Sequence, residues 1–182
     1  MVLHIVAFEG LDRAGKSTQV ARALEALSSP GVLPPSWSVA HLRYPQRIGT
    51  ATGPLIDAFL RGEADMPPNA ASLVLAANMW EAVALLEKES KAEHTLVISD
   101  RYAWTSAAYS SARGMSLDQA RAMTAGLPLP ALVVYLRLAP EAAVLRAGYG
   151  AERYERVDFQ RAVLSAMEHL AEEQSSITVA ID

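Results

Sequence analysis

A glycine-rich loop near the start of the chain constrains the fold more than any other feature. Residues 9–18 read EGLDRAGKST and fit the pattern G-x-x-x-x-G-K-[ST]. An apolar run over residues 3–8 precedes the loop, and apolar residues at helical spacing over residues 18–27 follow it, so the loop is predicted to join a buried strand to a helix. In that context backbone N–H groups bind phosphates, Lys16 reaches the β- and γ-phosphates of a nucleotide, and Ser17 ligates Mg²⁺. The sequence therefore predicts a nucleotide phosphate site.

The remaining chain alternates between predicted strands and predicted helices. Further strands are expected at 37–42, 95–99, 131–136 and 177–181. Helices are expected at 52–62, 69–91, 105–113, 116–124, 140–148 and 158–173. Four of these helices have an indicated N-cap residue, namely Thr52, Asn69, Ser116 and Asp158. Alternating strands and helices favour a mostly parallel sheet covered on both faces. We therefore expect one α/β domain over residues 1–182, with three layers and a five-stranded parallel sheet.

Composition excludes several classes of function. The chain has 182 residues, is 51% hydrophobic, carries a formal net charge of −4 and contains no cysteine. The absence of cysteine excludes a disulfide framework and a thiolate metal site. The acidic balance gives no indication of a nucleic-acid partner. No signal peptide and no membrane span is expected, so we expect a cytoplasmic protein.

Charged residues follow two of the predicted strands. Asp100 and Arg101 come directly after the buried strand 95–99, and Arg43 follows the strand 37–42. Ligands of open parallel sheets bind at the carboxyl ends of the strands, which favours a functional role for these residues over a solvated ion pair.

The order of these motifs resembles that of the thymidylate kinases. The most specific pieces are EGLDRAGKSTQ over residues 9–19 and Asp-Arg-Tyr over residues 100–102, and the resemblance runs from about residue 3 to residue 181. It implies a P-loop nucleoside-monophosphate kinase fold, Mg²⁺-dependent transfer of phosphate from ATP to dTMP, and a homodimer formed through helices.

The resemblance also implies individual roles. Its catalytic residues correspond to Asp12, Arg13, Lys16, Arg43, Asp100 and Arg101. Its ATP site corresponds to Gly10, Ala14, Gly15, Lys16, Ser17, Thr18 and Arg146, and its metal site to Ser17 and Asp100. Its acceptor site corresponds to Asp12, Arg43, Leu75, Asn78, Met79, Arg101, Thr105, Tyr109, Tyr154 and Gln160. Arg13 matches a transition-state arginine carried in the phosphate loop, and Tyr154 matches a tyrosine of the lid, about residues 147–157, that stacks by the deoxyribose.

The chain departs from the family pattern on the helix predicted at 69–91. The family has an aromatic residue at the position of Leu75 and an arginine that hydrogen-bonds the thymine O4 at the position of Met79. Neither leucine nor methionine donates a hydrogen bond. A deoxynucleotide kinase of broader base choice therefore remains an alternative, as does a nucleotide-binding regulator without turnover. The family usually has one more helix after the strand that ends near Asp182.

Overall fold

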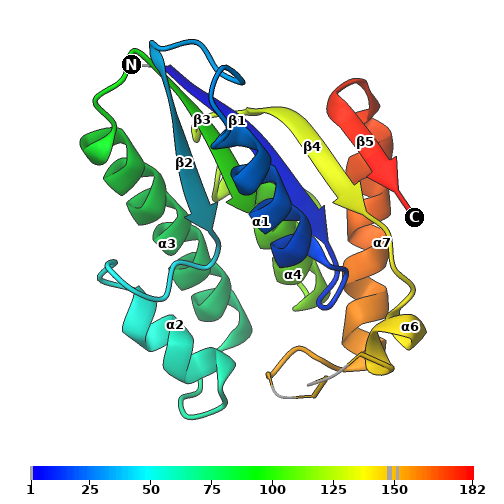
Figure 1. Ribbon diagram of the computed structural model, residues 1–182. Helices are drawn as coiled ribbons and strands as arrows, with labels where there is room; N and C mark the ends of the chain where they lie inside the picture. Colours follow the sequence, from blue (N-terminus) through cyan, green and yellow to red (C-terminus); the bar gives the residue numbers. More distant parts are fainter. Residues whose placement is uncertain (1, 147–148, 151) are drawn as a thin grey trace.

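The computed structural model describes residues 2–146, 149–150 and 152–182. Its centre is one parallel sheet of five strands in the order β2-β3-β1-β4-β5 (Figure 1). The strands are β1 (Val2–Gly10), β2 (Trp37–Arg43), β3 (His94–Asp100), β4 (Pro130–Leu136) and β5 (Thr178–Ile181). The predicted five-stranded parallel sheet is confirmed.

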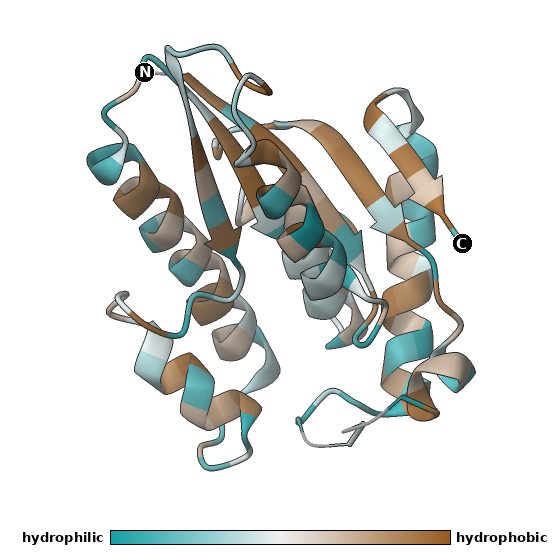
Figure 2. Cartoon of the chain, in the orientation of Figure 1, coloured by the Kyte–Doolittle hydropathy of each residue, from teal (hydrophilic) through white to brown (hydrophobic). Residues whose placement is uncertain are grey.

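Helices cover both faces of the sheet, because side chains along β1 alternate between two cores. Ile5 and Ala7 pack in the core shared with α2 (Gly53–Leu60) and α3 (Pro68–Glu89). Phe8 packs on the other face with Val20 of α1 (Lys16–Leu27). Brown strands lie between helices whose outer faces carry teal residues in Figure 2, which is the expected pattern for a three-layer domain.

The remaining helices extend the layer opposite α1. They are α4 (Ala103–Ala112), α5 (Leu117–Ala122) and α7 (Val157–Glu173), with the short α6 (Pro140–Val144) and a 3₁₀ turn over Ser175–Ile177. A core of side chains from α4, α5, α7 and β4 closes this side. Leu11, Trp104 and Tyr135 are buried in it, which places the beginning of α4 directly behind the phosphate loop.

Two of the predicted caps, Asn69 and Asp158, differ in the structure, while Thr52 stands at the N-cap of α2 as predicted but makes no side-chain hydrogen bond to that helix. Pro67 stands at the N-cap of α3 and Arg156 at that of α7, so Asn69 and Asp158 lie inside the first turns of those helices. The Thr52 hydroxyl at the start of α2 donates to Glu81 of α3, so it does not bond its own helix. Ser116 does cap α5, because its hydroxyl accepts from the backbone N–H of Gln119.

One helix of the described chain, α3, is long and apolar enough to cross a membrane by length and composition alone. This is weak evidence for a membrane span, because the core helix of a folded domain passes the same test. Ala76 and Met79 of α3 are both buried, and Met79 packs in the core that includes side chains of the sheet.

Candidate active site

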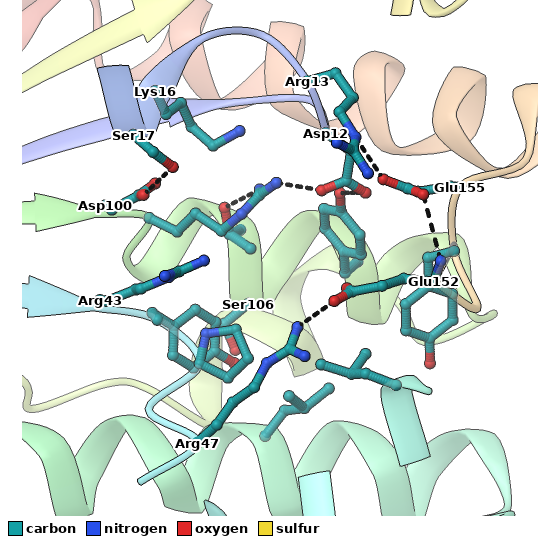
Figure 3. Close-up of a pocket in the computed structure, with 18 of the residues that line it drawn as sticks. Asp12, Arg13, Lys16, Ser17, Arg43, Arg47, Asp100, Ser106, Glu152 and Glu155 are labelled. Atoms are coloured by element: carbon teal, nitrogen blue, oxygen red, sulfur yellow. Dashed lines mark hydrogen bonds and ion pairs between the residues drawn. The ribbon is translucent and has the colours of Figure 1, made fainter. Parts of the chain in front are cut away.

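The carboxyl ends of three neighbouring strands bring the predicted charged residues together. Arg43 at the end of β2 pairs in register with Asp100 at the end of β3, and Asp100 pairs with Phe8 of β1. These strand ends open onto a cleft of about 520 Å³. Figure 3 shows Lys16, Ser17, Asp100, Arg43 and Asp12 converging on it. The prediction that Arg43 and Asp100 lie at the carboxyl ends of their strands is confirmed.

Two glycines give the phosphate loop backbone conformations that other residues rarely adopt. Gly10 has a φ of +144°, and a Cβ atom there would lie 2.4 Å from the Leu136 carbonyl oxygen of β4. Gly15 has a φ of +96° and stands directly before α1. Only glycine adopts both conformations at little cost, and its small size lets the loop backbone approach a ligand closely.

Lys16 and Ser17 occupy the first turn of α1. The Lys16 ammonium donates to the Leu11 carbonyl oxygen at 2.5 Å, within the loop itself. Burial and the nearby Arg101 guanidinium lower the pKa of Lys16 to about 7. The Ser17 hydroxyl donates to Asp100 at 2.6 Å (Figure 3). A hydroxyl and a carboxylate at this distance form the oxygen pair predicted to hold a metal.

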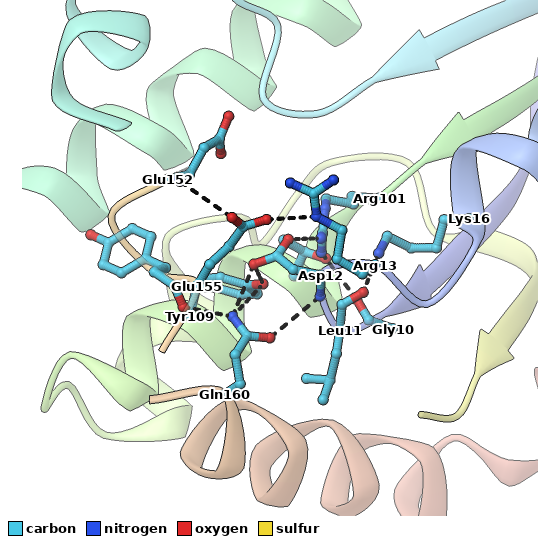
Figure 4. A network of polar contacts seen from close by, with 12 residues as sticks. Gly10, Leu11, Asp12, Arg13, Lys16, Arg101, Tyr109, Glu152, Glu155 and Gln160 are labelled. Atoms are coloured by element: carbon cyan, nitrogen blue, oxygen red, sulfur yellow. Dashed lines mark hydrogen bonds and ion pairs between the residues drawn. The ribbon is translucent and has the colours of Figure 1, made fainter. Parts of the chain in front are cut away.

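Asp12 is the centre of a polar network that joins the loop to α4 and α7 (Figure 4). Arg101 forms an ion pair with Asp12, Tyr109 donates to it at 2.8 Å and Gln160 at 2.9 Å. Burial alone would raise the pKa of Asp12, but Arg101 and Lys16 hold that pKa below its usual value. Asp12 is therefore an anion that is fixed in place beside the Arg101 guanidinium and close to the Lys16 amino group.

Arg101 itself is held in a sparsely populated conformation. Its φ is +72°, its backbone N–H donates to the Phe8 carbonyl oxygen at 3.0 Å, and its guanidinium also donates to the Gly10 carbonyl oxygen at 3.1 Å. Tyr109 and Asp12 keep the pKa of Arg101 above its usual value despite burial. Backbone strain of this kind is found at functional sites, where the surroundings enforce it.

The buried carboxylate of Glu9 was given no role by the sequence. One of its oxygens accepts from the backbone N–H groups of Tyr102, Trp104 and Thr105 at 2.9, 3.0 and 3.2 Å, and the other accepts from the Thr105 hydroxyl at 2.5 Å. Glu9 thus satisfies the N–H groups at the beginning of α4. It fixes the segment that carries Arg101.

Two further charged contacts bring the segment before α7 over the cleft. Arg13 of the loop donates to Glu155 at 2.8 Å, and Arg47, which follows β2, pairs with Glu152 at 2.7 Å (Figure 3). The sequence indicated a lid at about residues 147–157, but it did not indicate these partners. Residues 147, 148 and 151 of that segment lie outside the described chain.

The other predicted site residues divide into two groups. Thr18, Leu75, Thr105, Tyr109, Arg146 and Tyr154 line the cleft. Gly10, Ala14 and Gln160 are not among the lining residues, although the Gly10 carbonyl accepts from Arg101 and the Gln160 amide donates to Asp12, and both of these partners line the cleft. Arg146 donates to the Arg13 carbonyl oxygen and thereby joins the segment after α6 to the phosphate loop.

Asn78 and Met79 are not in the cleft, which corrects the expectation that both contact the acceptor. Met79 has no exposed surface and packs in the core between α3 and the sheet. The Asn78 side chain bonds the backbone of Gln46 in both directions, at 2.7 and 2.8 Å, and donates to two threonine hydroxyls. Asn78 therefore orders the loop that carries Arg47, because the buried amide uses its hydrogen-bonding capacity there.

A family model described as thymidylate kinase matches residues 8–181. The chain belongs to the thymidylate kinase family. Among its relatives, the thymidylate kinase of Arabidopsis thaliana is 38% identical over 98% of this chain and 65% of its own length, and the human one is 36% identical over 91% and 76%. The chain thus spans about two thirds to three quarters of the length of these relatives.

The fold matches solved structures of the same family. The thymidylate kinase from Candida albicans, which is described as having broad substrate specificity, has a TM-score of 0.79 and 27% identity to this chain. The match covers 98% of this chain and 83% of that one. The P-loop kinase fold that the resemblance implies is therefore confirmed.

Proposed function

We propose that this protein transfers the γ-phosphoryl group of ATP to dTMP, giving ADP and dTDP. The observation that carries the proposal is that the phosphate loop and the arginines at the strand ends line the same cleft, with Lys16 in the loop and Arg43 at the end of β2. Phosphoryl transfer needs little covalent help from the protein and depends on positioning and on neutralising several negative charges. Family membership supports the same reaction.

The ATP end is assigned to the loop. The backbone N–H groups between Gly10 and Ser17 and the N-terminus of α1 would bind the β-phosphate, and Lys16 would leave the Leu11 carbonyl for the β- and γ-phosphates. The Arg146 guanidinium lies 3.8 Å from the point that a Cβ atom added to Gly15 would occupy. Arg146 would therefore lie beside the nucleotide. Because Mg²⁺ takes hard oxygen ligands and keeps several waters, Ser17 and Asp100 suit it. When bound, the ion would neutralise charge on the phosphates.

The acceptor end is assigned to Arg43, Arg101 and Asp12. Arg43 and Arg101 would hold the acceptor phosphate in line with the γ-phosphoryl group, and Asp12 would accept from the sugar hydroxyl. An oxygen of the acceptor phosphate then forms a bond to the γ-phosphorus while the bond to the bridging oxygen breaks, and ADP leaves with that electron pair. Arg13 would neutralise the charge on the transferring group.

A coupled ADP-release assay tests this function. Wild-type protein with ATP and Mg²⁺ should release ADP with dTMP at a higher kcat/KM than with dUMP, dGMP or thymidine. Lys16→Ala, which removes one charge from the transferring group, should lower kcat at least about 100-fold while circular dichroism stays unchanged. Nucleotide binding without ADP release from any acceptor would contradict the proposal and indicate a regulator.

We propose in addition that the protein forms a homodimer through its helices, as the resemblance implies. Leu73 and Trp80 of α3 are 58% and 42% exposed, which leaves apolar surface on that helix. Light scattering after size-exclusion chromatography would measure the mass. A monomer at micromolar concentration would contradict this assignment.

A further inference from the structure

The base end of the cleft contains a positively charged side chain that the proposed roles leave unused. Arg113, the residue that follows α4, lines the cleft together with Leu75, Ser106 and Tyr154. Its Nη1 atom is buried and has no hydrogen-bond partner in the described chain. Such a donor costs free energy unless a ligand supplies an acceptor, so its position calls for an explanation.

The orientation of this guanidinium is fixed from three sides. Its Nε donates to the Ser72 hydroxyl of α3 at 3.1 Å, and its Nη2 donates to the Ser110 hydroxyl of α4 at 3.0 Å. The Tyr154 ring lies 5.3 Å from the guanidinium carbon. These contacts leave both N–H groups of Nη1 without a hydrogen-bond partner in the described chain. A donor held in this way loses little entropy when it binds a ligand.

Arg113 lies far from the phosphate end. From Ala103 to Arg113, α4 rises about 15 Å, because each helical residue adds about 1.5 Å. Arg101, which precedes this helix, is assigned to the phosphates. A monophosphate held by Arg101 would therefore extend along α4 toward Arg113, with the sugar between them and the base at the far end.

We infer that Arg113 selects the base, by donating from Nη1 to the carbonyl oxygen at C4 of thymine. This role rests on the proposed function. Met79 of α3 lies in the core and has no exposed surface, so it offers no contact to the base. The donor comes from the end of α4, while the helix α3 contributes Leu75 as an apolar surface for the base. Cytosine carries an amino group at C4 and would place a donor against a donor.

Arg113→Met, Arg113→Lys and the surface control Arg161→Met test the inference with dTMP and dCMP. Arg161 is exposed and pairs only with Glu141 among the contacts of the described chain. Arg113→Met should raise the dissociation constant and KM for dTMP about tenfold or more, since a hydrogen bond from a charged donor is lost. KM for ATP should stay unchanged, and the ratio of kcat/KM for dTMP to that for dCMP should fall by the same factor. Arg113→Lys should recover part of the preference.

The controls separate this inference from the proposed function. If wild-type protein fails to phosphorylate dTMP, the proposed function is wrong. The inference about Arg113 is then tested by calorimetry, which compares the dissociation constants of dTMP and dCMP for wild-type protein and Arg113→Met. If Arg113→Met lowers affinity for dTMP and dCMP equally, or leaves both unchanged, Arg113 does not read the base. Thermal unfolding of each variant shows whether folding is retained. If Arg113→Met unfolds, the dTMP to dCMP ratio of Arg113→Lys decides, and an unchanged ratio overturns the inference.

Discussion

The guanidinium of Arg13 and the carboxylate of Glu155 lie 2.8 Å apart, although 142 residues separate them in the sequence. Glu155 is nearly buried, whereas a third of the Arg13 side chain is exposed. The contact joins the phosphate loop to the segment before α7. It holds a cation at the cleft, beside the place assigned to the transferring phosphoryl group.

Arg13→Gly should lower kcat about 100-fold or more while leaving both KM values little changed. The lost interaction is expected mainly in the transition state. Glycine suits the site, because Arg13 has a φ of +65°. Steady-state kinetics with both substrates varied provides the measurement. Glu155→Gln keeps an acceptor oxygen and should reduce kcat far less; an increase in KM alone for Arg13→Gly would contradict the assignment.

Binding of MgATP should be accompanied by proton uptake at pH 8. Burial lowers the pKa of Lys16 to about 7, so most free protein carries an uncharged amine at pH 8. A polyphosphate raises that pKa again, because it favours the charged form. At pH 6 Lys16 is already charged in the free protein, so the proton uptake by Lys16 on MgATP binding should disappear.

Calorimetric titration in buffers of different ionisation enthalpy measures this uptake. Lys16→Met serves as the control and should show no pH-dependent difference from this source. Equal proton uptake by wild-type protein and Lys16→Met at pH 8 would show that another group titrates.

Arg43→Ala should raise KM for the monophosphate about tenfold or more and leave KM for ATP unchanged. Arg43 ends β2 and lines the cleft, and it is assigned to the acceptor phosphate. A hydrogen bond to a charged group contributes about 1.5–3 kcal/mol. The exposed Arg161 of α7, changed to alanine, is the matched control. Equal losses for both nucleotides would place Arg43 elsewhere in the reaction.

The fold was predictable because each strand and helix carries its own local pattern. The run before Gly10 and the apolar stretch 95–99 identify the two central strands, and their carboxyl ends place Asp100 beside the loop. Pairing of Arg13 with Glu155 was not predictable, since nothing in local spacing records which distant side chains meet.

Met79 shows the limit of reasoning from helical spacing. Leu75 and Met79 are four residues apart and share a helix face, yet Leu75 lines the cleft and Met79 is in the core. One face of a helix covers about one third of its circumference. One edge of that face can therefore contact a ligand while the other edge packs against the sheet. Arg113 was missed for a related reason, because its position at the cleft depends on how α4 packs against α3.

Tyr154→Ala should increase the activity with UMP relative to dUMP. The Tyr154 ring lines the cleft and stacks on Phe159, with centroids 4.7 Å apart. It also forms T-shaped pairs with the rings of Tyr109 and Phe59. Removing the ring opens space where the resemblance places the sugar. Tyr154→Phe keeps the ring and should keep the wild-type preference. An unchanged ratio of kcat/KM for UMP and dUMP in Tyr154→Ala would show that the ring does not exclude the 2′-hydroxyl.

Glu9→Gln should destabilise the protein and lower kcat together. Both Glu9 oxygens accept hydrogen bonds at the beginning of α4. A glutamine whose oxygen keeps the backbone N–H groups would place an NH2 group against the Thr105 hydroxyl, which would lose its acceptor. An unsatisfied buried group costs about 1–3 kcal/mol, and in a domain of this size each kcal/mol lowers the Tm by about 2–4 °C.

Thermal unfolding and steady-state kinetics measure both effects of Glu9→Gln. Activity should fall because the start of α4 positions Arg101, whose guanidinium also contacts Thr105. Glu25→Gln on the exposed face of α1 makes the same chemical change and should alter neither quantity. A Tm equal to that of wild type in Glu9→Gln would mean that the amide rotates to satisfy all of these donors, and that the charge of Glu9 is not needed to hold α4.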